Sequence, residues 1–228
     1  MEEAGVNTRF VAVLSETRSG NAIIQNDKDG DNCIILYGGA NQAITRKQVD
    51  EVVAEFEEGD FIILQNEINE LGYIMEKAHE KKMKIVLNPS PMNEKILALP
   101  LNYVDYFMLN EVEAGQILHT TEISGEVLTD QLLEHFPNAS IVLTLGGNGS
   151  VYADKNKKVP QAVYRVKAVD TTAAGDTFTG FFIAGLVHGE SVEVAMDMAS
   201  KAAAIAVTRP GAAPSIPTFE EVKAFTVS

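Results

Sequence analysis

Short apolar runs alternate with helix-like stretches from about residue 45 onward, and this alternation restricts the fold more than any other feature. The runs are predicted strands, at Phe61–Leu64, Lys84–Leu87, Val104–Leu109 and Ile141–Leu145. The intervening helices are predicted at Thr45–Glu57, Asn69–Lys81, Asn110–Leu118 and Leu128–His135. Strands buried on both faces read as continuous apolar runs, and parallel neighbours need a crossover, usually a helix. The pattern predicts an α/β fold: a mostly parallel, Rossmann-like sheet with helices on both faces and ligands at the carboxyl ends of its strands.

Both flanks of this region have a different pattern. The N-terminal part is predicted to hold β-strands at Arg9–Leu14, Asn21–Gln25 and Asn32–Tyr37, the last two forming a hairpin around a turn at residues 26–30. Antiparallel strands are expected within Ser150–Val169, followed by two long helices, Asp176–His188 and Ser191–Thr208. We expect a partial β lid over residues 1–40 and one α/β core over residues 41–228.

Composition excludes several classes of function. The 228 residues include 18 Lys and Arg against 32 Asp and Glu, which gives a net charge of -14. A diffuse acidic surface disfavours nucleic acids and anionic membranes, because both bind through cationic side chains. No apolar run is long enough to span a bilayer, and the first residues do not resemble a signal peptide. A soluble, cytoplasmic protein is expected.

The segment Val169–Phe178 carries the clearest chemical pattern. A strand ends, a turn of small residues follows, and a helix begins. Ala173, Ala174 and Gly175 let a ligand approach their amides closely, and the N–H groups of a helix N-terminus attract phosphate. Asp176 lies beside them and could deprotonate an attacking hydroxyl. It could equally cap the helix, and the residues alone do not separate the two interpretations.

Asp170–Phe178 resembles the signature of the ribokinase family, the PfkB carbohydrate kinases, which reads Asp-Thr-x-x-Ala-Gly-Asp-x-Phe. Further segments resemble the family in the same order along the chain: Tyr37–Asn41, Leu87–Pro91, Leu109–Glu113, Leu143–Gly149 and Ala202–Ser215. The likeness runs through essentially the whole chain. It implies an ATP-dependent kinase that phosphorylates a primary hydroxyl of a small sugar, with ribose as the first expectation.

The resemblance implies roles for individual residues. Asp176 matches the catalytic base, and the amides of Ala173, Ala174 and Gly175 match the anion hole for the γ-phosphate. Nucleotide contacts are implied for Asn110, Thr144, Gly146, Gly149 and Ser200. Asn110 and Glu113 match residues that arrange phosphate and hydrated Mg²⁺. A solvated helix carboxylate at Glu113 and a plain strand-to-hairpin connection at Gly149 are the structural alternatives.

A monovalent cation site, for K⁺, is also implied by the resemblance. Its residues would be Asp170, Thr172, Ala206, Arg209, Gly211 and Ser215, and the alternative is a proline-bounded surface loop. Asp170 also matches a position near the sugar. Glu67 matches a sugar contact at a strand end, and a helix-terminal carboxylate is the competing interpretation there.

The likeness begins inside the family pattern, without the family's first core strand and Gly-Gly-Lys-x-x-Asn sugar clamp. Two expectations follow. Uncovered sheet edges and apolar surface favour a homodimer or larger homo-oligomer. Sugar binding should be weakened more than ATP binding, so a nucleotide-binding protein with little or no turnover and an oligomeric scaffold remain alternatives to the kinase.

Overall fold

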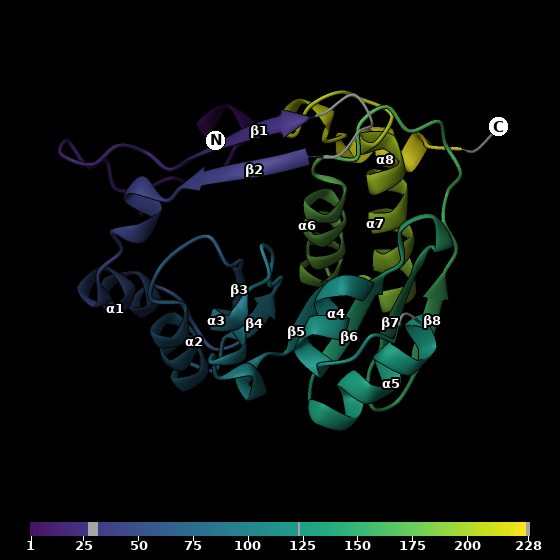
Figure 1. The fold of residues 1–228 in the computed structure, drawn as a ribbon, viewed down its shortest axis with the longest axis horizontal. Coiled ribbons are helices and arrows are strands. Elements are labelled where there is room, and N and C mark those ends of the chain that lie inside the picture. The colour runs from purple at the N-terminus through teal and green to yellow at the C-terminus, as the bar shows by residue number, and fades with distance from the viewer. Residues whose placement is uncertain (27–31, 123, 227–228) are drawn as a thin grey trace. The chain divides into compact units, whose positions relative to one another are not determined.

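The computed structural model describes residues 1–26, 32–122 and 124–226, and it divides into two compact units. Unit 1 comprises residues 1–85 and 90–103, and unit 2 comprises residues 86–89 and 104–228. The chain passes from unit 1 to unit 2 in the middle of strand β4 (Figure 1). No helix of the described residues is long and apolar enough to cross a membrane.

Unit 1 contains a β-hairpin and two helix–strand repeats. Its strands are β1 (Asn21–Asn26), β2 (Asn32–Tyr37), β3 (Phe61–Leu64) and the first two residues of β4 (Lys84–Leu87). Its helices are η1 (Glu2–Ala4), η2 (Gly39–Gln42), α1 (Arg46–Ala54), α2 (Leu71–Glu80), α3 (Glu94–Leu97) and η3 (Leu101–Tyr103). β1 and β2 are antiparallel, with Asn21 opposite Tyr37, which confirms the predicted hairpin. Its predicted turn at residues 26–30 lies largely outside the described residues.

Local sequence signals explain where the helices of unit 1 begin. The Thr45 hydroxyl accepts a hydrogen bond from the Gln48 N–H, and the Gln48 side chain accepts one from the Thr45 N–H. This reciprocal capping box starts α1. Val49 and Val53, four residues apart, are buried, as an amphipathic helix requires.

The predicted strand at Arg9–Leu14 is wrong, because the structure has a turn and irregular backbone there. Val11 and Val13 are exposed, 55% and 94%, so the apolar residues that suggested a strand are not buried. An apolar run alone does not make a strand when no neighbouring strand supplies hydrogen bonds.

Unit 2 holds the rest of the chain. Its strands are the end of β4, β5 (Tyr106–Asn110), β6 (Ser140–Thr144), β7 (Ser150–Ala153) and β8 (Lys158–Gln161). Its helices are α4 (Glu111–Leu118), α5 (Gly125–His135), η4 (Gly146–Asn148), α6 (Ala174–Val187), α7 (Val192–Ala206), η5 (Ala213–Ser215) and α8 (Phe219–Ala224).

The sheet of unit 2 switches once from parallel to antiparallel pairing. β4, β5 and β6 are parallel neighbours, and β6, β7 and β8 are antiparallel neighbours. The expected α/β sheet with antiparallel strands after residue 150 is therefore confirmed. Asn110 pairs with Thr144, so the last residues of β5 and β6 lie side by side at one edge of the sheet.

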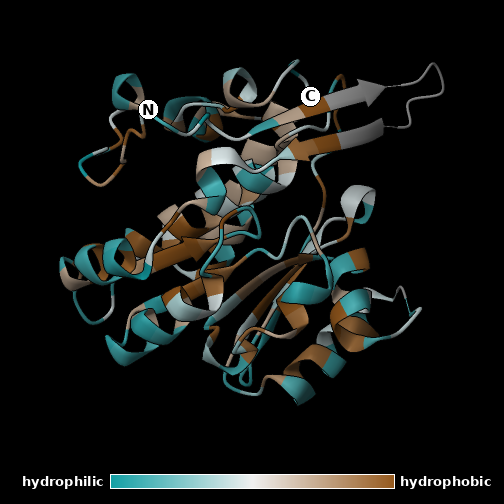
Figure 2. Cartoon of the chain, turned by 60° about the vertical axis from the view of Figure 1, so that its left-hand side comes forward, coloured by the Kyte–Doolittle hydropathy of each residue, from teal (hydrophilic) through white to brown (hydrophobic). Residues whose placement is uncertain are grey.

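Helices cover both faces of this sheet. Consecutive strand residues point to opposite faces. On β5 the Tyr106 ring contacts Phe182 of α6, whereas the neighbouring Phe107 ring contacts Phe136 at the end of α5. Figure 2 shows hydrophobic and hydrophilic residues alternating along the helices, as expected for helices that pack on a sheet with one side only.

Candidate active site

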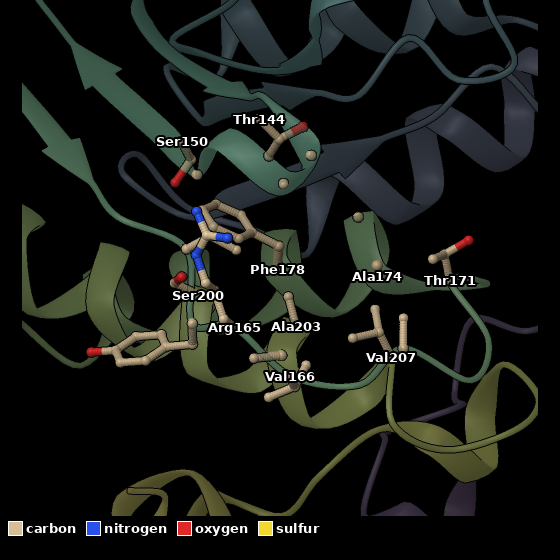
Figure 3. Close-up of a pocket in the computed structure, with 18 residues that line it drawn as sticks. Thr144, Ser150, Arg165, Val166, Thr171, Ala174, Phe178, Ser200, Ala203 and Val207 are labelled. Atoms are coloured by element: carbon tan, nitrogen blue, oxygen red, sulfur yellow. The ribbon is translucent and has the colours of Figure 1, made fainter. Parts of the chain in front are cut away.

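A pocket of about 540 Å³ lies in unit 2, between the end of β6, the segment after β8, the start of α6, and α7 (Figure 3). Six of the predicted site residues line it: Thr144, Gly146, Gly149, Ala174, Gly175 and Ser200. They come from three separate parts of the chain. The structure thus brings the predicted glycine turn, the predicted phosphate turn and the predicted nucleoside contact to one cavity.

The glycine turn between β6 and β7 requires its glycines. Gly146 and Gly149 have φ values of 52° and 93°, in a region that favours glycine. A Cβ on Gly149 would lie 2.3 Å from the Gln161 carbonyl oxygen. The Thr144 hydroxyl donates a 3.2 Å hydrogen bond to the Leu109 carbonyl, which ties the end of β6 to β5. Gly149 therefore serves the strand connection and also lines the pocket.

Helix α6 starts in an unusual way. Its N-cap is Ala173, with φ 61° and no side-chain hydrogen bond to the helix. The Ala174 N–H donates to the Thr171 carbonyl at 3.2 Å. The amides of Ala173 and Gly175 have no hydrogen-bond acceptor in the described part of the chain. Uncapped N–H groups at a helix start make an anion-binding site.

Asp176 is the third residue of α6, directly after the pocket-lining Gly175, and it is exposed. Because Ala173 occupies the N-cap position, the interpretation of Asp176 as the N-cap residue is wrong. A carboxylate in the first turn of a helix is stabilised by the helix dipole.

Asn110 and Glu113 interact with each other at the start of α4. The Asn110 side-chain oxygen accepts from the Glu113 N–H, and the Glu113 carboxylate accepts from the Asn110 N–H, both at 2.9 Å. Glu113 is 8% exposed, so the alternative interpretation of this residue as a solvated helix carboxylate is wrong. The Asn110 side-chain NH₂ donates to none of the described residues, which leaves donors free at the sheet edge.

Asp170 joins the turn before α6 to the loop after α7. Its carboxylate accepts hydrogen bonds from the Thr172 N–H and the Gly211 N–H, both at 2.9 Å. Hydrogen bonds from Thr172 and Gly211 hold the pKa of Asp170 below its ordinary value. The Val207 carbonyl accepts from the N–H groups of Val169 and Asp170, at 2.7 and 3.2 Å.

The other residues of the predicted cation site lie in the same part of unit 2. The Arg209 side chain pairs with Glu221 of α8 and lowers the pKa of Glu221 to about 2. Because a guanidinium has no acceptor, only the backbone carbonyl of Arg209 could serve a cation site. Ala206 ends α7 and is fully buried. The Ser215 hydroxyl donates to the Ala212 carbonyl at 2.7 Å.

Among described residues, no group of three or more His, Cys, Asp or Glu side chains is placed to hold a metal ion. A K⁺ site built from carbonyl oxygens and one carboxylate would have no such group.

Glu67 is the one predicted site residue in unit 1. It is exposed in the turn after β3, and its carbonyl accepts a 2.9 Å hydrogen bond from the Gln42 side chain. Helix α2 begins only at Leu71, so the competing interpretation of Glu67 as a helix-terminal carboxylate is wrong. Its role at the sugar stays a prediction.

Sequence reasoning missed several pocket residues. Arg165 lies in irregular backbone after β8, where no periodicity indicates which side chains face inward. Phe178 lies in α6 and is only 5% exposed, as a core residue is, yet it also lines the pocket. A helical signal was present on α7: Ser200, Ala203 and Val207 are spaced three and four residues apart and line one wall.

Comparison with known proteins identifies the family. Residues 1–219 match the model for the pfkB family carbohydrate kinases. Ribokinase from Staphylococcus aureus (strain COL) is 33% identical over 228 residues, which cover 96% of this chain and 73% of that protein.

Solved structures agree. Cryptococcus neoformans ribokinase in complex with ADP superposes with a TM-score of 0.85 at 28% identity, over 98% of this chain and 76% of that one. Arabidopsis thaliana ribokinase complexed with ribose and ATP superposes with a TM-score of 0.76 at 25% identity, over 92% of this chain and 69% of that one. The chain belongs to the pfkB family of carbohydrate kinases and is therefore a phosphotransferase.

Proposed function

We propose that this protein transfers the γ-phosphoryl group of ATP to a primary hydroxyl of a small sugar, ribose being the first candidate. The observation that carries this proposal is the pocket that joins the glycine turn at Gly146–Gly149 to the uncapped start of α6, with Asp176 next to it. The similar ribokinases bound to ADP, or to ribose and ATP, support the choice of reactants.

In the proposed reaction, Asp176 accepts the proton of the sugar hydroxyl while that oxygen attacks the γ-phosphorus. The new sugar O–P bond forms, the bond from the γ-phosphorus to the bridging oxygen breaks, and ADP leaves with the electron pair. The amides of Ala173 and Gly175 donate hydrogen bonds to the γ-phosphoryl oxygens, whose charge they stabilise. Ala174 contributes if its long bond to Thr171 is exchanged for one to phosphate.

We assign the nucleotide to the pocket in one orientation. Its phosphates lie toward Ala174 and Gly175, and its nucleoside lies toward Ser200. Thr144, Gly146 and Gly149 border it from the end of β6. Asn110, whose amide nitrogen is free among the described residues, would bind phosphate oxygens from the neighbouring strand end.

Mg²⁺ and K⁺ fit the residues present. Glu113 is a buried carboxylate beside Asn110 and would hold the hydrated Mg²⁺, which offsets phosphate charge when bound. Asp170, Thr172 and Gly211 would surround K⁺ together with carbonyls near Ala206, Arg209 and Ser215. The Asp170 carboxylate would supply the negative charge of the cation site, and hydrogen bonds from Thr172 and Gly211 lower its pKa further below the ordinary value. Asp170 and Glu67 remain the proposed contacts to the sugar.

A coupled assay of ADP release tests the proposal with a panel of pentoses, hexoses and nucleosides. Asp176→Asn should lower kcat by about 10²–10⁴, the contribution of a general base, and leave ATP binding intact. Glu190→Gln, an exposed carboxylate beyond the other end of α6, is the matched control and should keep activity.

Sugar-dependent turnover in Asp176→Asn equal to that of the control would refute the proposed base. ATP that raises the melting temperature without any ADP release would identify a nucleotide-binding protein that lacks turnover. If ATP neither raises the melting temperature nor yields ADP, the scaffold alternative remains.

We also propose self-association through the hairpin of unit 1. Ile23, Ile35 and Leu36 are 58%, 55% and 57% exposed on β1 and β2, and Figure 2 shows hydrophobic colour on the described part of this hairpin. Exposed apolar residues on a two-stranded hairpin favour packing against a second copy. A stable monomer in light scattering at micromolar concentration would contradict this.

A further inference from the structure

The pocket has two chemically different ends. The Ser200 hydroxyl contacts the Ala162 carbonyl at 3.4 Å, and the Val169 N–H donates to the Val207 carbonyl at 2.7 Å. The segment 162–169 therefore runs beside α7 from Ser200 to Val207, a distance of roughly 10 Å at 1.5 Å per helical residue. The Val207 end adjoins the start of α6, and the Ser200 end lies away from it.

Arg165 stands out at the Ser200 end. Among the 18 described residues that line the pocket, it alone is charged. In the view of Figure 3 its guanidinium points to the side of the pocket where Ser150 and Ser200 are labelled, and Ala174 is labelled on the other side. Although the chain has 32 acidic residues, Arg165 makes no ion pair, hydrogen bond or ring contact with any described residue.

Ser150 provides a second unsatisfied group at the same end. It pairs with Gln161 across β7 and β8, next to Ala162. Ser150 is 6% exposed, and its hydroxyl oxygen is buried without a hydrogen-bond partner among described residues. Buried polar groups are nearly always hydrogen-bonded, so an unpartnered hydroxyl on a pocket wall indicates a ligand group or an ordered water.

We propose that Arg165 and Ser150 bind the nucleoside half of the nucleotide. The planar guanidinium lies against the face of the base and donates hydrogen bonds to ribose oxygens, and the Ser150 hydroxyl makes a second polar contact. The proposal rests on the kinase function proposed above, because the phosphates are assigned to the start of α6. Arg165 then acts on nucleotide affinity and not on the chemical step.

Calorimetric titration with AMP, ADP and ATP, without sugar, tests this proposal. Arg165→Ala should weaken the binding of all three nucleotides by the same factor, about tenfold. This factor should change little when tetramethylammonium chloride is added. At saturating ATP its kcat should stay within about twofold of the native value. Arg165→Lys keeps the charge but not the planar fork, so it should recover less than half of the loss in log Kd.

Two further variants complete the test. Lys167 is an exposed cation in the same segment, but it does not line the pocket, so Lys167→Ala should leave nucleotide binding unchanged. Ser150→Ala should weaken the three nucleotides about threefold without lowering the melting temperature of the ligand-free protein, because it removes an unpartnered buried hydroxyl.

Different results would overturn different claims. A loss that grows from AMP to ATP and shrinks with added salt would place Arg165 at the phosphates and overturn the nucleoside assignment. Equal behaviour of Arg165→Ala and Lys167→Ala would remove Arg165 from the site while leaving the kinase proposal intact. A native protein that binds neither ADP nor ATP would overturn both.

Discussion

Gly175 allows the phosphate site to be tested separately from the fold. It lies in the first turn of α6 with helical backbone, and a Cβ added there would meet no atom within 4 Å. Nothing in the described structure therefore requires glycine at this position. If the glycine is needed, it is needed by a ligand that approaches the helix start.

The two effects of Gly175→Ala have opposite signs. Alanine is favoured over glycine in a helix by roughly 0.5–1 kcal/mol, so the ligand-free protein should become more stable. For a domain of this size that raises Tm by about 1–4 °C. The new methyl group tilts toward the helix N-terminus, over the amides. Displacing the γ-phosphate by about 1 Å lowers kcat/KM by roughly 10²-fold.

Gly180→Ala is a matched control on the same helix. Gly180 is exposed, lies outside the pocket and also has space for a methyl group. Both variants should raise Tm in thermal unfolding without nucleotide, and only Gly175→Ala should lose activity in the ADP-release assay. If Gly175→Ala keeps kcat/KM within about threefold of Gly180→Ala, the amides at the start of α6 do not hold the transferred phosphoryl group.

Three other variants have defined outcomes. Asp170→Asn should lower Tm at neutral pH. Because hydrogen bonds hold the folded-state pKa of Asp170 below the ordinary 3.8, this Tm difference should shrink only as the pH falls below 3.8 and through the folded-state pKa, and a Tm difference that does not shrink on acidification would contradict the assignment. Ala173→Gly should stabilise the protein by about 0.5–1 kcal/mol in urea unfolding, since glycine adopts φ 61° without strain. Gly149→Ala should destabilise it by about 2–4 kcal/mol, because φ is 93° and the Gln161 carbonyl lies 2.3 Å from the new Cβ; unchanged stability would show that the turn relaxes.

Periodicity was sufficient to predict the α/β core. The runs at 61–64 and 84–87 coincide with β3 and β4, because an apolar run between two helices is best buried inside a parallel sheet. The same reasoning failed at residues 9–14, where no partner strand exists among the described residues to complete the backbone hydrogen bonds. Strand formation depends on a distant neighbour that a local pattern does not contain.

The resemblance indicated six residues that the structure brings to one pocket, and no sequence signal indicated the pocket residues that lie in irregular backbone. Gly146 and Gly149 matched a family motif, and the structure adds the physical reason for glycine there, because both have positive φ. Arg165 follows β8 in a segment without regular structure, so neither a helical nor a strand period predicts that it faces the pocket. Side-chain direction in such a segment is set by the packing of 162–169 beside α7, which only the folded structure reveals.

Ala173 shows how the fold and the proposed function conflict at one residue. A sequence chosen for helix stability alone would place Ser, Thr, Asp or Asn at the N-cap of α6, as Thr45 does for α1 and Ser191 for α7. A capping side chain would occupy the N–H groups that the proposed site offers to phosphate. Alanine leaves them open and adopts left-handed backbone at a cost of roughly 1–2 kcal/mol. The uncapped, strained start of α6 is thus the pattern expected when ligand binding and not helix stability determines the residues.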